Sequence, residues 1–300
     1  MRALLYHHTN RGEQALTKHL SQGLRREDDE FKILPKEDFH PEQLEGVDVV
    51  FTGRVVTSGY IMEACAARGI NFIYFDKGYF HRGWKTDDPD IYYRFSINSF
   101  QPLSYFQAIP RPADRWNKLG IRLKPRTRGE RILITGCSQK FSNLHGFSNE
   151  DFIRNTVERL KKFTKRPIVY RPKSSDRHAA PVSGALFSHH QCKIEEELKN
   201  AHAVVTFSSN TAADALIAGV PAFVLGPSIA RPLSNTDLSQ IENACFPSDK
   251  ERLQWCHDLA YCQWRVGEME DGSLWRELKR LFFSLNLRMP KDQTLSGVLG

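Results

Sequence analysis

Short apolar runs alternate with amphipathic stretches in the first third of the chain. The runs have the length of strands and are apolar throughout, which is typical of a parallel sheet covered on both faces. In order, the predicted elements are a strand Arg2–His8, a helix Glu13–Leu24, strands Phe31–Leu34 and Val47–Thr52, a helix from Thr57 or Ser58 to Ala67, and a strand Asn71–Phe75. Strands that alternate with helices predict a doubly wound parallel sheet.

The same alternation starts again after residue 130. The predicted elements there are a strand Arg131–Thr135, a helix from Ser148 to about Phe163, a strand Pro167–Tyr170, a helix Lys193–Ala201, and two terminal amphipathic helices, Asp249–Trp264 and Ser273–Leu285. The segment before them, Ile121–Glu130, is basic and poor in apolar residues, as linkers are. We therefore expect two α/β domains, each with its own sheet, and a cleft between them.

The linker sets the expected domain boundaries. Residues 1–120 form the first domain, 121–130 the linker and 131–300 the second domain, whose terminal helices brace the cleft. Pro125 and Gly129 make a hinge within the linker a reasonable expectation.

The most informative stretch is Ala203–Gly226. It predicts a strand Ala203–Phe207, a polar turn, a helix Thr211–Ala218 and a strand Pro221–Leu225. A polar turn and a helix N-terminus at the carboxyl end of a strand favour phosphate binding. The candidate donor-binding residues here are Ser208, Ser209, Asn210, Thr211 and Asp214, whose carboxylate could accept hydrogen bonds from ribose hydroxyls. The alternative is an ordinary strand–helix–strand unit in which the serines only cap the helix.

Two further loops of the second domain carry polar side chains at strand ends. Ser138 and Lys140 follow the strand Arg131–Thr135, and Arg171 and Lys173 follow Pro167–Tyr170. Cations at these positions would stabilise the charge that develops on a departing phosphate, Arg in a bidentate manner and Lys as a point charge. The alternative is that both are ordinary polar loops.

In the first domain, the candidate catalytic residues are Asp76 and His8, each at the end of a predicted strand. One carboxylate or imidazole is needed there to take the proton of an acceptor hydroxyl. Asp76 is the preferred base, although it could simply begin the turn at Gly78. One of the consecutive residues His7 and His8 must point inward, so one of the two is expected to be structural.

The candidate acceptor-binding residues are Tyr79, His81, Arg82 and Trp84, in the loop after Asp76. They belong to a longer run of interleaved rings and cations: Tyr79, Phe80, Arg82, Trp84, Lys85, Tyr92, Tyr93, Arg94, Arg111 and Arg115. Rings with cationic neighbours suit a nucleobase or a sugar ring. Half of the rings are expected to pack the core instead, Tyr92 or Tyr93 among them.

Composition changes this picture in three ways. The net charge of +7 and the pI near 9.1 favour a polyanionic partner such as nucleic acid, an anionic polysaccharide or a nucleotide. Six cysteines without a CxxC pair indicate reduced, mostly buried thiols in a cytoplasmic protein, and neither a signal peptide nor a transmembrane run is apparent. The acidic run Asp87–Asp90 is no DxD motif after an apolar strand, so no metal site and no cofactor are expected.

Three stretches, in order along both domains, resemble the capsule polysaccharide synthesis family, which includes β-Kdo transferases of the GT-B fold. The family's first motif is two acids, Gly, an aromatic residue, an apolar residue and Arg. The stretch Asp76–Arg82 is similar, with Lys77 in place of the second acid and one extra residue before Arg82. The second motif, a basic residue, Pro and a basic or His residue after a strand, is matched by Arg171–Lys173.

The third family motif is a Ser/Thr-rich turn followed by Gly-x-Glu-Ala-Leu and Gly-x-Pro. It resembles Ser208–Thr211, Ala212–Leu216 and Gly219–Pro221, with Ala212 in place of Gly and Asp214 in place of Glu. The resemblance implies a GT-B glycosyltransferase whose second domain binds the nucleotide-sugar donor and whose first domain holds the acceptor and the catalytic base.

The expected function is an inverting, metal-independent transfer of sugar from a UDP-, GDP- or CMP-linked donor to a hydroxyl. The basic charge and compact size favour a hydroxymethylpyrimidine base in double-stranded DNA, the acceptor of phage-type DNA glucosyltransferases, which share the GT-B fold. The family resemblance favours a capsule or lipopolysaccharide acceptor. A protein that binds a nucleotide or nucleic acid without catalysis is a further alternative.

Overall fold

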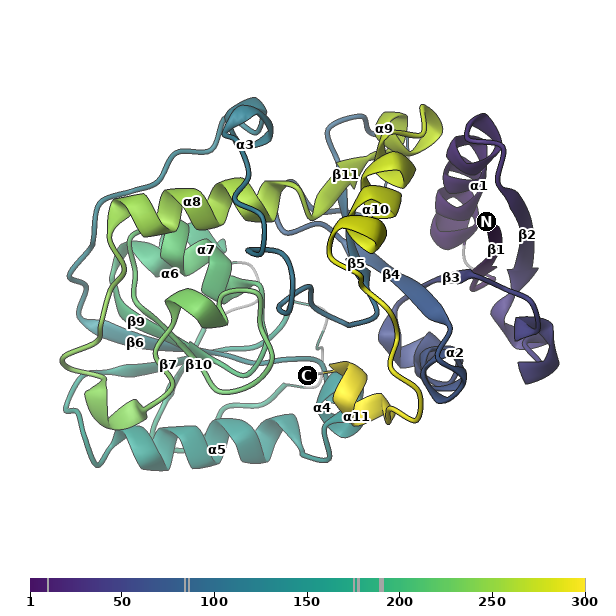
Figure 1. The fold of residues 1–300 in the computed structure, drawn as a ribbon. Coiled ribbons are helices and arrows are strands. Elements are labelled where there is room, and N and C mark those ends of the chain that lie inside the picture. Colours follow the sequence, from purple (N-terminus) through teal and green to yellow (C-terminus); the bar gives the residue numbers. More distant parts are fainter. Residues whose placement is uncertain are drawn as a thin grey trace. The chain divides into compact units, whose positions relative to one another are not determined.

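The chain folds into two compact α/β units, shown in Figure 1. The structure, a computed structural model, describes residues 1–9, 11–83, 85, 87–174, 176, 179–188 and 192–299. The first unit comprises residues 1–119 and 257–300, and the second comprises residues 120–256. The sequence predicts residues 257–300 in the second domain, whereas in the structure they pack with the first unit.

A six-stranded sheet forms the centre of the first unit. Its strand order is β11-β5-β4-β3-β1-β2. The strands are β1 (Arg2–His7), β2 (Glu30–Pro35), β3 (Val49–Gly53), β4 (Asn71–Lys77), β5 (Tyr92–Ile97) and β11 (Gln263–Arg265). Strands β1 to β4 are parallel, as predicted, but β5 runs antiparallel to β4, and β11 runs antiparallel to β5.

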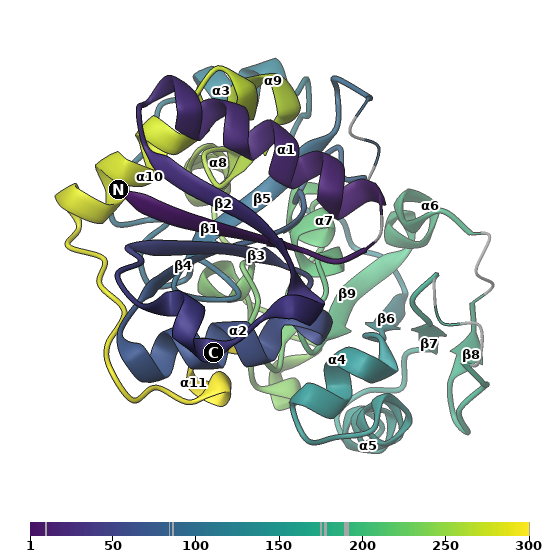
Figure 2. The same ribbon diagram turned by 90° about the vertical axis from the view of Figure 1, so that its right-hand side faces the viewer.

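Helices cover both faces of this sheet (Figure 2). On one face lie α1 (Arg11–Arg26), α9 (Val266–Glu270) and α10 (Ser273–Ser284), and on the other lie α2 (Val55–Arg68) and α11 (Leu295–Leu299). The core between α1, α10 and the sheet includes Leu16, Leu20, Phe51 and Trp275, all at most 2% exposed. Burial of this apolar surface explains why the last part of the chain belongs to the first unit.

Arg115, in helix α3 (Asp114–Lys118) of the first unit, binds residues 260–268. Its guanidinium donates to the carbonyl oxygens of Ala260 at 3.1 Å and Gln263 at 2.8 Å, and it pairs with Glu268 at 2.6 Å. Helix α8 (Asp249–Ala260) therefore ends before the predicted boundary at Trp264, because carbonyls that would continue the helix accept from Arg115. The residues after it pair with β5 as β11.

The second unit is built on a wholly parallel five-stranded sheet of order β10-β9-β6-β7-β8. Its strands are β6 (Arg131–Thr135), β7 (Ile168–Arg171), β8 (Leu186–Phe187), β9 (Ala201–Thr206) and β10 (Ala222–Val224). Its helices are α4 (Gln139–Leu144), α5 (Asn149–Leu160), α6 (Ile194–Lys199) and α7 (Thr211–Ile217). Apolar residues of α5 pack on one face of the sheet, and those of α6 and α7 pack on the other.

The predicted linker is docked on the second unit. The amide of Lys124 donates to Ile217 O at 2.8 Å, and that of Thr127 donates to Gly219 O at 2.7 Å. Gly219 has φ +83° and leaves no room for a side chain, because a Cβ atom would lie 1.9 Å from Pro125 O. These contacts hold the segment that was expected to form a hinge.

Strand order identifies where each sheet favours a ligand. In doubly wound sheets, ligands bind at the carboxyl ends of the strands where the order reverses. That position lies between β1 and β3 in the first unit and between β6 and β9 in the second.

Candidate functional site

Asp76 lies at the carboxyl end of β4 and is held by three groups. Its Oδ2 accepts a hydrogen bond from the Tyr74 hydroxyl at 2.7 Å and lies 3.7 Å from Arg94 Nη2, and its Oδ1 accepts from the amide of Lys77 at 2.8 Å. The side chain is still 28% exposed. Burial raises the pKa of Tyr74 well above its ordinary value, and the neighbouring carboxylate adds to this, so the hydroxyl stays protonated as a donor.

The loop that follows Asp76 is fixed by the strands around it. Gly78 packs so closely on β5 that a Cβ atom would lie 2.6 Å from Tyr92 O. The side-chain oxygen of Gln263, on β11, accepts from the amides of Tyr79 at 2.8 Å and Phe80 at 2.9 Å. The residues that return from the second unit therefore shape the loop that carries the first predicted motif.

The predicted acceptor-binding residues differ in their surroundings. Tyr79 is completely buried and donates to Gln101 at 2.9 Å, so its ring packs the interior and offers no surface to an acceptor. His81 and Arg82 are exposed; His81 contacts Leu119 O at 3.1 Å, and Arg82 donates to Tyr79 O at 2.9 Å. Trp84 lies outside the described residues. Of these four, His81 and Arg82 are the ones whose described side chains reach the surface.

The other rings and cations of that run are largely structural. Tyr93 is completely buried and Tyr92 is 8% exposed, as expected for rings that pack the core. Arg111 pairs with Glu277 at 2.6 Å, and Arg115 pairs with Glu268. Both arginines tie the chain before residue 120 to its last part, so they do not form a basic acceptor surface.

A buried ion pair lies at the carboxyl ends of β1 and β3. Lys36 Nζ donates to Glu13 Oε2 at 2.7 Å and to Gly53 O at 2.6 Å. The Lys36 side chain is 2% exposed and that of Glu13 is 0% exposed. Glu13 also accepts from the amide of His8 at 3.0 Å and lies 3.4 Å from Arg54 Nε. Burial lowers the pKa of the Lys36 ammonium, and the Glu13 carboxylate opposes that effect.

This pair was not predicted from the sequence, and it positions the other predicted catalytic residue. His8 is half-buried just after β1, with its amide held by Glu13. Arg54 precedes α2 with φ +55°, a conformation that a non-glycine residue rarely adopts and that often accompanies function. Helix α2 thus begins at Val55, earlier than the predicted caps Thr57 and Ser58.

The predicted phosphate turn follows β9 in the second unit. Ser209 Oγ accepts from the amide of Thr211 at 3.2 Å and lies 3.0 Å from Thr211 Oγ1, while Ser208 donates to Pro227 O. Asn210 occupies the cap position without a side-chain cap bond, and Asp214 lies in the first turn of α7. Ser209 and Thr211 are half-buried. A ligand that binds their hydroxyls would replace the hydrogen bond between the two.

The remaining predicted donor residues follow β6 and β7, the neighbours of β9 in the sheet. Ser138 accepts from the amide of Phe141 at the start of α4, on which Lys140 is exposed. Arg171 ends β7 and donates to Cys192 O at 2.7 Å, and Lys173 is exposed just beyond it. Burial raises the pKa of Cys137, in the loop after β6, to about 11, and the charge of Lys173 acts against this rise.

An aromatic cluster adjoins the serine turn and was missed from the sequence. His145 contacts Phe141, Phe147 and Phe207, with ring centroids 4.7, 6.4 and 5.1 Å away. Its Nε2 is buried without a hydrogen-bond partner among the described residues. Burial lowers the pKa of His145 below its ordinary value near 6.5.

The lowered pKa of His145 predicts an acid-sensitive second unit. Below about pH 6.5 the unfolded chain takes up a proton at this residue that the folded chain excludes, so stability is present above that pH and is lost as the pH falls. His145→Phe should lose less stability than the wild type between pH 7.5 and 5.5, as measured by urea unfolding midpoints. Equal losses of stability in the two proteins would show that His145 is not the source of the acid sensitivity.

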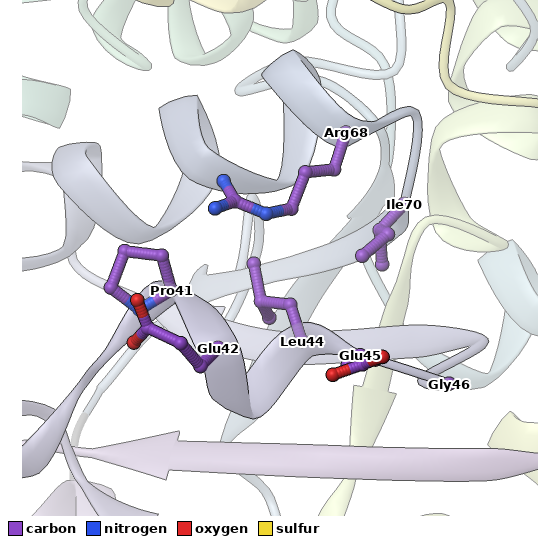
Figure 3. A pocket seen from close by; sticks show the side chains of 7 residues that line it. All are labelled: Pro41, Glu42, Leu44, Glu45, Gly46, Arg68 and Ile70. Atoms are coloured by element: carbon purple, nitrogen blue, oxygen red, sulfur yellow. The ribbon is translucent and has the colours of Figure 1, made fainter.

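No helix among the described residues is long and apolar enough to cross a membrane, and those residues contain no cluster of three His, Cys, Asp or Glu side chains suited to a metal ion. A shallow pocket of about 440 Å³ lies beside Gly46 and Ile70 (Figure 3). Those residues precede β3 and β4, so the pocket lies at the amino ends of the strands, opposite the end that carries Asp76.

Comparisons with known proteins identify the fold. No protein-family model matches the chain, and no curated protein matches its sequence. Thermosulfurimonas dismutans KpsC, described as a beta Kdo 2,4 transferase, is similar with a TM-score of 0.55 and 13% identity over 88% of this chain and 91% of that one. The same organism's KpsC beta Kdo 2,7 transferase is similar with a TM-score of 0.51 and 11% identity, over 92% and 100% of the two chains. At these identities the likeness shows the fold alone, and it confirms the GT-B fold that the motifs predicted.

Proposed function

We propose that the protein is a nucleotide-sugar-dependent glycosyltransferase with Asp76 as its catalytic carboxylate. The observation that carries this proposal is the state of Asp76 in a GT-B fold: a strand-end carboxylate oriented by Tyr74, Lys77 and Arg94, yet still accessible. A carboxylate held in this way is suited to accept a proton from a substrate hydroxyl. His8, at the end of β1, is the second candidate for contact with the acceptor.

The proposed chemistry is a single displacement at the anomeric carbon. Asp76 takes the proton of the acceptor hydroxyl as the acceptor oxygen bonds to that carbon. The bond from the anomeric carbon to the phosphate oxygen breaks, and its electron pair leaves with the phosphate, whose charge Lys173, Arg171 and the serine turn would stabilise. This mechanism needs no metal and inverts the anomeric configuration; a retained configuration in the product, seen by NMR, would contradict Asp76 as a base.

The second unit is the proposed donor-binding part. Ser138, Ser209, Thr211 and the cations after β6 and β7 lie at the carboxyl edge of its parallel sheet, on the strands that flank the reversal of strand order and their neighbour. Asp214, in the first turn of α7, is proposed to accept from the ribose hydroxyls. A UDP-, GDP- or CMP-linked sugar fits this set of groups, which offers hydroxyls and cations to phosphate.

A charge substitution tests this placement. Lys173 follows β7, whereas Lys165 precedes the same strand, and both are exposed. Lys173→Met should weaken donor binding about tenfold, because a charged hydrogen-bond donor to phosphate is lost. Lys165→Met changes the net charge equally and should leave the donor Kd unchanged. Isothermal calorimetry distinguishes the two, and equal effects would show that only overall charge matters.

The proposed acceptor is a saccharide hydroxyl. The two similar structures are described as β-Kdo transferases, and among the predicted acceptor residues Arg82 offers a cation and His81 an imidazole at the surface. A hydroxymethylpyrimidine in double-stranded DNA is the second candidate, because the net charge of +7 favours a polyanion. A cytoplasmic location would suit either acceptor.

A mass-spectrometric transfer assay decides between these acceptors. Purified protein is offered a panel of UDP-, GDP- and CMP-linked sugars, including CMP-Kdo, with capsule or lipopolysaccharide oligosaccharides or with DNA that contains 5-hydroxymethylcytosine or 5-hydroxymethyluracil. A mass gain on the oligosaccharide supports the proposal, and a gain on the nucleoside supports the DNA alternative. Binding of a donor without any transfer or hydrolysis would favour the non-catalytic alternative.

A further inference from the structure

Arg94 is a buried charge in the middle of β5, between Tyr93 and Phe95, which are themselves buried. Its side chain is 6% exposed, and in the sheet it lies directly opposite Asp76, on the neighbouring strand β4. The shortest ion-pair distance between the two is 3.7 Å, from Nη2 to Oδ2. Arg94 is therefore a cation that the fold has placed against the proposed catalytic carboxylate.

Aromatic rings form most of the remaining surroundings of Arg94. Its guanidinium carbon lies 5.4, 5.5 and 4.6 Å from the ring centroids of Tyr74, Tyr79 and Phe100. Its Nε and Nη1 are buried and have no hydrogen-bond partner among the described residues. Unsatisfied buried donors are costly, and the rings compensate only in part.

A second buried arginine among the described residues has more of its hydrogen-bond donors satisfied. Arg252 is completely buried, and its two terminal nitrogens donate to Leu216 O at 2.6 Å, to Lys124 O at 3.0 Å and to Asp249 at 2.5 Å. Arg252 leaves only its Nε without a described hydrogen-bond partner, whereas Arg94 leaves both Nε and Nη1 and lies beside an accessible carboxylate. Groups that are costly for stability are retained mainly at functional sites.

We propose that Arg94 and the Tyr74 hydroxyl are positioning residues that orient the Asp76 carboxylate through a charge and a hydrogen bond. The proposal rests on the function proposed above. Both groups approach the same oxygen, Oδ2, while Oδ1 receives the Lys77 amide. Arginine is always protonated, and a buried tyrosine hydroxyl remains a donor, so the carboxylate keeps both partners across the working pH range.

Other charged or titratable groups also face Asp76 and are common to every variant below. Lys36, just after β2, and Tyr79 each interact with Asp76 through charge, Arg54 interacts with Lys36, and the Lys77 amide donates to Asp76. Because substitutions at residues 74 and 94 leave all of them in place, a change in the protonation of Asp76 can be assigned to the substituted group.

Three variants and one control test the proposal. Tyr74→Phe removes one oxygen atom, Arg94→Met removes the charge, and Arg94→Lys restores a charge without the planar guanidinium. Tyr105→Phe is the control: it removes a buried hydroxyl of the same unit that accepts from the amide of Ile97 and, among the described residues, makes no hydrogen bond with Asp76. Donor affinity should be equal in all five proteins, because the proposed donor site lies in the second unit.

The expected result is a fall in kcat of about tenfold in Tyr74→Phe and Arg94→Met, with the acid limb of the pH–rate profile moved to higher pH. The kcat and the acid limb of Arg94→Lys should lie between those of Arg94→Met and the wild type, and Tyr105→Phe should match the wild type in both. A purely structural role would lower the amount of active protein without moving the acid limb. Unmoved limbs in both Tyr74→Phe and Arg94→Met, or an equal shift in the control, would overturn the proposal.

A titration that does not depend on turnover separates this inference from the proposed function. The carboxyl carbon of Asp76 is followed by ¹³C NMR and assigned by its loss in Asp76→Asn. Its midpoint should move to higher pH in Tyr74→Phe and Arg94→Met but not in Tyr105→Phe. Shifted midpoints in a protein that turns over no donor would retain the positioning role and refute the glycosyltransferase; unshifted midpoints would refute the positioning role alone.

Discussion

Asp76→Asn is expected to lower kcat for sugar transfer by about 100- to 10,000-fold, the usual contribution of a positioned general base. The amide keeps the size of the side chain and can still accept from the Tyr74 hydroxyl, but it cannot take a proton. The donor Kd should be unchanged, because the proposed donor-binding groups lie in the second unit. Initial rates and calorimetry measure the two effects separately.

The control for this substitution is Asp90→Asn. Asp90 is an exposed carboxylate in the segment between β4 and β5, so its removal changes the net charge equally within the same unit. It should leave kcat within twofold of the wild type. Near-ultraviolet circular dichroism checks that Asp76→Asn is folded, since Arg94 loses its carboxylate partner. Full turnover by folded Asp76→Asn would exclude Asp76 as the base.

Glu13→Gln is expected to produce the largest loss of stability, because it leaves the Lys36 ammonium buried without a carboxylate. Removing one partner of a buried pair costs about 3–5 kcal/mol. In a unit of this size that corresponds to a fall in Tm of roughly 6–20 °C. Differential scanning calorimetry of the transition assigned to the first unit measures it.

A double-mutant cycle shows whether the effect belongs to the pair. Glu13→Gln combined with Lys36→Met removes both charges and should be more stable than Glu13→Gln alone. Glu150→Gln, which breaks an exposed pair with Arg154, should leave the transition in place. If the double variant were as unstable as the sum of its two single variants, the buried ion pair would not be the cause.

Much of the fold follows from local patterns. The strand Arg131–Thr135 was predicted with its observed bounds, and the unit Ala203–Gly226 has the predicted strand–turn–helix–strand order. In both stretches a continuous apolar run is followed directly by a polar turn, so neighbouring residues alone indicate where the strand ends. The same reasoning placed Asp76 at a strand end, because a parallel strand followed by Gly78 leaves few other positions for it.

The differences arise where distant segments decide the structure. The direction of β5 is not encoded in its own apolar pattern, and β11 exists because Gln263–Arg265 meets β5 and Arg115. The Glu13–Lys36 pair joins a helix start to the end of another strand, and neither residue stands out alone. Tyr79 was predicted to contact the acceptor, but its ring is completely buried, with its amide bonded to Gln263 and its hydroxyl to Gln101.

Arg94 is visible in the sequence as a charged residue, but the sequence alone predicted the wrong surroundings for it. Arg94 interrupts the apolar run of β5, which is buried along its whole length. A single charge in such a strand must find a partner, and only the register of β4 and β5 identifies that partner as Asp76. The sequence grouped Arg94 with an exposed acceptor surface because the direction of its side chain depends on that pairing.

The most direct test of the central claim is the release of nucleotide from sugar donors by the wild type and by Asp76→Asn. Each UDP-, GDP- and CMP-linked sugar is incubated with either protein in the presence of the acceptor panel, and free nucleotide is quantified by chromatography. The wild type should release nucleotide from one class of donor, and Asp76→Asn should bind that donor but release almost none. Failure of the wild type to bind or cleave any donor, or equal release by the two proteins, would contradict the account.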